Sequence, residues 1–149
     1  MKQLMSIIAF LLFLLMGTIP ACTTGATGPF FQKLESKEQG IAIVYLFAQW
    51  NIAPTRTYPI KANGEPVVKL VDGGYYPFRV APGVVTFEVD TTARERIPVM
   101  LHAESGQTYF VQAIRKRHGE ELKLLSEEQA IHLIVPCRLI LDAPALKSP

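Results

Sequence analysis

Residues 57–89 read TYPIKANGEPVVKLVDGGYYPFRVAPGVVTFEV, and this stretch decides the fold. Asn63-Gly64 is a strong signal for a two-residue hairpin turn, because both central positions of that turn need a positive φ angle. From Val85 to Val89 apolar and polar residues alternate, as they do in a strand with one buried face. The stretch therefore predicts consecutive β-strands joined by tight turns.

The same alternation of strands and turns extends over most of the chain. Residues 41–47 are apolar throughout and rich in β-branched and aromatic side chains, which indicates a strand covered on both faces. Strands are expected up to residue 125, about seven in all at intervals of roughly ten residues, and this spacing is typical of a sandwich or barrel. We therefore expect an all-β domain over residues 40–142, built as an antiparallel β-sandwich.

The C-terminal part of the expected domain has a different pattern. Ser126-Glu127-Glu128-Gln129 has the form of a capping box, and apolar residues follow it at helical spacing. This predicts a short helix over residues 127–135, with a strand over residues 131–135 as the alternative. Residues 143–149 are expected to form a disordered tail.

The first 21 residues have the order of a secretory signal peptide, with a positive start, an apolar core and small residues before a cleavage site. The apolar core is shorter than the roughly 20 residues of a spanning helix, so an uncleaved anchor is the less favoured alternative. Ile19-Pro20-Ala21-Cys22 resembles the bacterial lipobox, which implies cleavage between Ala21 and Cys22 and acyl chains, such as palmitate, on Cys22. Thr23 then implies the outer membrane as the destination. Residues 22–39 would be a flexible tether, with the alternative that the fold already begins at Phe30-Phe31.

The chain contains two cysteines, Cys22 and Cys137. If Cys22 is lipidated, Cys137 is expected to be a buried free thiol, because its neighbours in the sequence are apolar. If the cleavage site is an ordinary one, a Cys22–Cys137 disulfide becomes the alternative in an oxidising envelope.

No pattern of catalytic or metal-binding residues stands out. The formal net charge of +2 among 149 residues does not indicate nucleic-acid binding. A G-x-S-x-G motif is missing, and the three histidines lack the spacing of metal ligands. We expect no catalytic, metal or cofactor site. A remote alternative, an envelope hydrolase, would need His102 or His118 beside Cys137.

Two features are candidates for binding. Arg115, Lys116 and Arg117 form a basic cluster at a predicted strand end, where it could contact anionic lipid head groups or cell-wall polymer. Its alternative role is that of a solvated hairpin tip, neutralised by acidic neighbours. Trp50 is expected in an exposed loop and Tyr75 on the outer face of a strand, where aromatic rings can stack on sugars or contact a protein.

Several short motifs carry a resemblance to a family. They are Ala42-Ile43-Val44-Tyr45-Leu46, Asn63-Gly64, Gly74-Tyr75-Tyr76 and Gly106-Gln107-Thr108-Tyr109-Phe110-Val111. The chain resembles uncharacterised bacterial lipoproteins grouped as a domain of unknown function, relatives of PEGA-type and immunoglobulin-like small β-sandwiches. The resemblance implies a fold and no catalytic residues.

These observations together favour a lipid-anchored, non-catalytic binding or structural module of the bacterial cell envelope that faces the periplasm. An envelope protein or peptidoglycan is the expected partner. The main alternative is a carbohydrate- or peptidoglycan-binding module that uses the exposed aromatic residues and the basic cluster.

Overall fold

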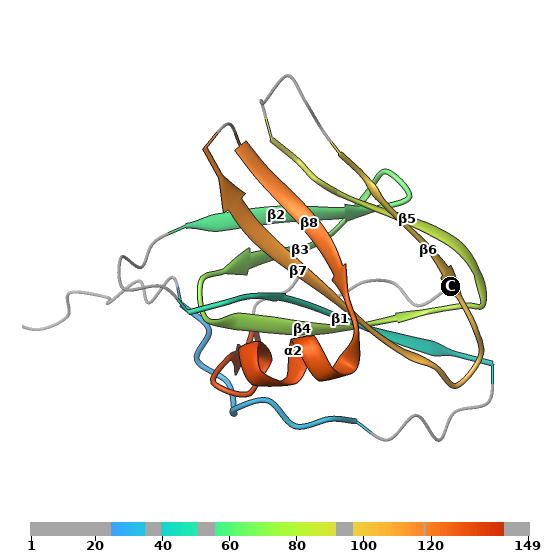
Figure 1. Cartoon of the computed structure of the whole chain (residues 1–149), viewed down its shortest axis with the longest axis horizontal. Coiled ribbons are helices and arrows are strands. Elements are labelled where there is room, and N and C mark those ends of the chain that lie inside the picture. The colour runs from blue at the N-terminus through green and yellow to red at the C-terminus, as the bar shows by residue number, and fades with distance from the viewer. Residues whose placement is uncertain (1–24, 35–39, 51–55, 92–96, 118, 142–149) are drawn as a thin grey trace, which may run out of the picture.

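The computed structural model describes residues 25–34, 40–50, 56–91, 97–117 and 119–141 (Figure 1). Most of these residues lie in strands, and the chain has one short helix in this part, as predicted for an all-β domain. The elements are, in chain order, β1 (Ala42–Ala48), β2 (Thr57–Ala62), β3 (Glu65–Val71), β4 (Gly74–Val80), β5 (Gly83–Val89), β6 (Val99–Ala103), β7 (Thr108–Lys116), β8 (Gly119–Leu125), α2 (Glu127–Ile134) and β9 (Arg138–Leu139).

The strands form two sheets that pack on each other. The order is β8-β7-β1-β4-β9 in the five-stranded sheet and β3-β2-β5-β6 in the four-stranded sheet. Most neighbours are antiparallel, but β1 pairs in parallel with β7, and β4 pairs in parallel with β9. The prediction of a purely antiparallel sandwich is therefore wrong for these two pairs. Between β1 and β7 the chain forms β4 of the same sheet and all four strands of the other sheet, and β7 then runs beside β1 in the same direction.

Strand β1 is buried on both faces, as its continuous apolar sequence predicted. Val44 and Leu46 face the core between the two sheets. Tyr45 and Phe47 face the opposite way, into a second apolar cluster beneath α2. The five-stranded sheet is thus the middle layer of the domain, between the other sheet and a covering layer.

The predicted hairpin is confirmed between β2 and β3. Asn63 and Gly64 have φ angles of 50° and 86°, and Ala62 lies opposite Glu65 in the register. The Asn63 side-chain oxygen also accepts a hydrogen bond from the Thr86 backbone N–H at 2.9 Å. The turn therefore ties β3 to β2 and β2 to its other neighbour, β5.

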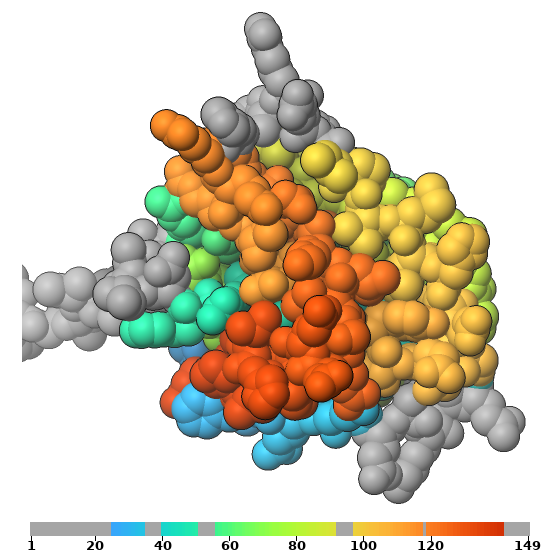
Figure 2. Space-filling model, in the orientation of Figure 1, coloured from blue at the N-terminus to red at the C-terminus, as the bar shows by residue number. Residues whose placement is uncertain are grey.

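Helix α2 forms where the capping box predicted a helix, so the alternative strand over residues 131–135 is wrong. The Ser126 hydroxyl accepts from the Gln129 backbone N–H, and the Gln129 side chain accepts from the Ser126 N–H. Ala130 and Ile134 lie one turn apart and are buried against the five-stranded sheet. Figure 2 shows α2 in red on this face, with the N-terminal segment in blue beside it.

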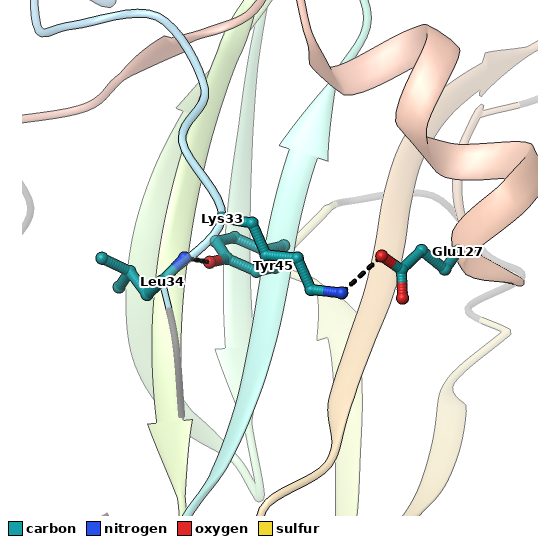
Figure 3. Close-up of polar contacts among 4 residues, drawn as sticks. All are labelled: Lys33, Leu34, Tyr45 and Glu127. Atoms are coloured by element: carbon teal, nitrogen blue, oxygen red, sulfur yellow. Dashed lines mark hydrogen bonds and ion pairs between the residues drawn. The ribbon is translucent and has the colours of Figure 1, made fainter. Parts of the chain in front are cut away.

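The N-terminal segment, residues 25–34, belongs partly to the fold. Its backbone is hydrogen-bonded to the chain around β9: the Gly28 N–H donates to the Leu139 carbonyl at 3.0 Å, and the Phe31 N–H donates to the Cys137 carbonyl at 2.9 Å. The Leu34 N–H donates to the Tyr45 hydroxyl at 2.6 Å (Figure 3).

These contacts tie residues 28–34 to the sandwich, in keeping with the alternative that the fold begins near Phe30-Phe31 and before residue 40. An apolar contact holds the segment there, because the Phe31 ring packs edge-on against Tyr45 at 5.0 Å between ring centroids. Lys33 forms an ion pair with Glu127 of α2 (Figure 3). The leader, Cys22 and the predicted tail lie outside the described residues.

One end of the sandwich collects several of the predicted binding residues. Because β1 and β7 are parallel, Ala48 lies beside Ala113, and the residues that follow each strand emerge at the same end. The N-terminal segment begins there. The turn before β4 is hydrogen-bonded to the end of β1, because the Gly73 N–H donates to the Ala48 carbonyl at 2.9 Å. We call this the Trp50 end; it lies at the left of Figure 1.

Candidate functional site

Trp50 is held at this end by a glycine turn. It follows β1 by two residues, and 60% of its surface is exposed. A Cβ atom added to Gly73 would lie only 2.7 Å from Cδ1 of the indole, and Gly73 has a φ angle of 74°. Only glycine fits both conditions, since other residues rarely adopt this conformation. The indole therefore rests on the turn between β3 and β4 and keeps its other face open.

A polar cleft of about 360 Å³ lies on one side of Trp50. It is lined by residues of three strands and of the loop after β1: Gln49, Trp50, Tyr58, Asp72, Gln112, Ala113, Ile114 and Arg115. The structure thus brings together Trp50 and Arg115, which the sequence singled out as two separate features.

A carboxylate at the bottom of the polar cleft is only partly satisfied. The Tyr58 hydroxyl donates to Oδ1 of Asp72 at 3.0 Å. The other oxygen, Oδ2, is buried and has no hydrogen-bond partner within the described ranges, and the same holds for Nη1 of Arg56, whose carbonyl accepts from the Asp72 N–H at 3.3 Å. Burial, and next the hydrogen bond to Asp72, raises the pKa of Tyr58 to about 12, so its hydroxyl stays protonated at neutral pH. One acceptor and one donor, on Asp72 and Arg56, are thus buried here without a partner.

A larger apolar cleft of about 590 Å³ is also lined by Trp50. Its walls come from the N-terminal segment, the end of β1, the β3–β4 turn and the chain around β9: Gly25, Ala26, Phe30, Gln49, Trp50, Asp72, Gly73, Pro136 and Arg138. The Arg138 guanidinium lies over the Phe30 ring, 4.0 Å from its centroid. This cation–π contact keeps a positive charge at the rim of an otherwise apolar surface.

Tyr75 does not form part of a binding surface, and the prediction that it is exposed is wrong. Its exposed fraction is 4%, and its ring packs edge-on against Phe31 at 5.3 Å. Alternation along β4 correctly placed Tyr76 on the side of the core between the sheets. The other face of β4 is covered too, because α2 and the N-terminal segment pack over it, and no pattern within β4 reports that cover.

Arg115, Lys116 and Arg117 are exposed at the hairpin between β7 and β8, and we call them the basic tip. Lys116 forms an ion pair with Glu121 at 3.6 Å, and Arg115 lies opposite Glu120 in the register. The acidic neighbours expected for a solvated tip are therefore present. Arg115 nevertheless also lines the polar cleft, so one side of the tip borders this cleft.

Cys137 is a fully buried free thiol, as predicted for the case in which Cys22 is lipidated. Its Sγ lies 3.4 Å from the Leu133 carbonyl and 3.6 Å from that of Ala48. Burial raises the pKa of the thiol to about 12, although the backbone N–H of Trp50 counteracts this slightly. A nucleophilic cysteine needs the opposite shift.

The histidines within the described ranges do not approach this thiol. His102 is exposed on β6 of the other sheet, and His132 is exposed on α2. His118 lies outside the described residues. In the described part of the chain, moreover, no cluster of three or more histidine, cysteine or acidic residues could hold a metal ion.

The cleft residues that the sequence did not single out include Phe30, Asp72 and Arg138. Phe30 lies where the sequence left both a tether and the start of the fold open, and Asp72 lies in one of the predicted tight turns. The Phe30-Phe31 pair was the one available signal, since two adjacent aromatic residues are unusual in a solvated tether.

Comparisons with protein-family models, with curated proteins and with solved structures gave no match. The resemblance to a lipoprotein family therefore stays a prediction. None of the helices in the described ranges has the length and apolar character needed to cross a bilayer.

Proposed function

We propose that this protein is a lipid-anchored, non-catalytic binding module of the bacterial cell envelope, held at the outer membrane and facing the periplasm. The observation that carries the proposal is the exposed Trp50 ring, which lines two clefts at the end of the domain where the N-terminal segment begins. Cys22, the lipobox cysteine, is three residues before Gly25, and Gly25 lines the apolar cleft. The binding surface and the attachment point are therefore neighbours.

The anchor is tested by the intact mass of protein extracted from isolated membranes. We expect a chain that begins at Cys22 and carries the added mass of two or three acyl chains, because two or more chains are needed for stable attachment. The Cys22→Ala variant should lose this mass and its retention in the outer-membrane fraction. A soluble wild-type protein without acyl mass, or one with a Cys22–Cys137 disulfide, would refute the anchor.

A second function, binding of a cell-wall glycan, is favoured by one specific observation. The polar cleft is lined by an aromatic ring, a carboxylate and a guanidinium, from Trp50, Asp72 and Arg115. A sugar ring offers an apolar face for the indole and hydroxyl donors for the carboxylate. The guanidinium suits a carboxylate or an amide oxygen of the wall polymer.

Glycan binding is tested by co-sedimentation with purified peptidoglycan sacculi. Trp50→Ala and Arg115→Ala should each weaken binding about three- to tenfold, the range given by roughly 0.7–1.4 kcal/mol for one stacking or ionic contact. Lys69→Ala, an exposed lysine of β3 outside both clefts, is the matched control for lost charge. Equal binding by all four proteins would exclude the polar cleft as a glycan site.

A further inference from the structure

We propose that the Trp50 end of the sandwich lies on the surface of the bilayer that holds the anchor, with Trp50 and Phe30 in the interfacial layer and the basic tip over anionic head groups. The proposal rests on the proposed acylation of Cys22. It goes beyond it, because an anchor alone does not determine which face of a domain meets the membrane.

The first step is the reach of the chain. Three residue steps join Cys22 to Gly25, and a fully extended chain covers at most about 10 Å over that length. Gly25 lines the apolar cleft, and Gly28 is already hydrogen-bonded to Leu139. An acylated Cys22 sits at the membrane surface, so the short peptide from Cys22 to Gly25 is all that separates the apolar cleft from that surface.

The second step is the chemistry of the surface that is brought so close. Phe30 and Trp50 are 52% and 60% exposed, and they line the same cleft together with Pro136. Tryptophan and other aromatic residues are enriched at the depth of lipid head groups, where an apolar ring and a polar edge are both accommodated. The adjacent Val135 is also half exposed, which extends the apolar surface along the end of α2.

The third step is charge. Arg138 is held over Phe30 at the rim of the apolar cleft, and it suits a phosphate when Phe30 enters the interface. The parallel pairing of β1 and β7 carries the basic tip to the same end of the sandwich as Trp50. Basic residues next to a bilayer are attracted by anionic lipids. Aromatic and cationic groups thus converge on the end from which the anchor leaves.

The opposite end of the sandwich lacks this combination among its described residues. Strand β1 is seven residues long, which separates its two ends by roughly 23 Å. Val80 lies beside Ala42 at the start of β1, so the turn before β5 is at the far end from Trp50. Val84 in that region is 54% exposed and provides a reference position of similar exposure.

Trp50 is the only tryptophan in the chain, so its fluorescence reports this site alone. The lipoprotein would be purified in detergent and reconstituted into vesicles of phosphatidylethanolamine and phosphatidylglycerol, with or without bromine on the upper acyl chain. We expect at least twofold quenching of Trp50 by the brominated lipid and reduced quenching by iodide in the buffer. The control carries Trp50→Phe with Val84→Trp and should show the reverse pattern.

The outcomes separate this inference from the proposed function. If the intact mass shows acyl chains but Trp50 is quenched by iodide and not by brominated lipid, the orientation is wrong and the anchor stands. Equal lipid quenching at positions 50 and 84, or protection of Trp50 from both quenchers, overturns the orientation as well. If the mass shows no acyl chains, the proposed anchor fails first and the inference fails with it.

Discussion

The hydroxyl of Tyr45 is the most specific point at which to test whether the N-terminal segment is part of the fold. It accepts the Leu34 N–H at 2.6 Å, and Tyr45→Phe removes this one acceptor atom. The ring itself should stay in place, because it stacks on Phe110 at 5.4 Å and contacts Phe31 edge-on. The change therefore isolates the attachment of the segment from the packing of the core.

The expected cost is the net value of one hydrogen bond, about 1 kcal/mol, since the freed N–H at the partly exposed Leu34 can bond to water. For a domain of roughly one hundred residues, the entropy of unfolding is about 0.2 kcal/mol/K, so Tm should fall by about 5 °C. Amide exchange at Leu34 should become about fivefold faster, the factor that corresponds to 1 kcal/mol.

Tyr109→Phe is the matched control, because the Tyr109 hydroxyl also bridges two backbone groups, the His102 carbonyl and the Glu104 N–H, both at 3.1 Å. It should lower Tm without changing exchange at Leu34. Thermal unfolding and hydrogen exchange followed by NMR measure both quantities. If Leu34 exchanges at the same rate in wild type and Tyr45→Phe, the segment is not held by this bond and our reasoning is refuted.

Three further predictions concern the core and the turns. The thiolate fraction of Cys137 at neutral pH should be about a thousandfold lower than that of an ordinary thiol with a pKa of 9.0. Alkylation of Cys137 should therefore be slow until denaturant is added. Rapid labelling of the native protein would contradict the burial of this thiol. Cys137 and Tyr58 both have a raised pKa, so the folded state keeps protons that the unfolded chain releases at high pH. The urea concentration at the unfolding midpoint should therefore fall as the pH rises from about 9 to about 12. The fall should be less steep in Tyr58→Phe. Gly73→Ala should lower the free energy of unfolding by more than the roughly 1–2 kcal/mol of a positive φ angle, and it should shift the Trp50 emission. Gly64→Ala, with open space around it, should cost only that amount. An unchanged emission in Gly73→Ala would place the indole elsewhere.

Features that depend only on residues close together in the sequence could be predicted. The Asn63-Gly64 turn and the capping box at Ser126 are examples, because each conformation is determined by the few residues that form it. The burial of β1 on both faces was also predictable, since a strand with no polar face has nowhere to place solvent-exposed side chains.

The missed features depend on which segments meet across the fold. Tyr75 looks like an outer-face residue within β4, and only the arrival of Phe31 and α2 buries it. The parallel pairing of β1 with β7 has no local signal either. The candidate site was therefore only half predictable: Trp50 and Arg115 stood out individually, but their position on one cleft follows from that pairing.

The position of β1 has a consequence for how the chain reaches its native state. Both neighbours of β1 come much later in the sequence: Ala42 pairs with Val80, and Ile43 pairs with Thr108. Closing such long loops costs conformational entropy before the strand contacts that offset this cost can form, so the central sheet should assemble slowly. Until then an uncovered apolar heptapeptide can pair with other copies of itself, so aggregation during refolding should depend steeply on protein concentration.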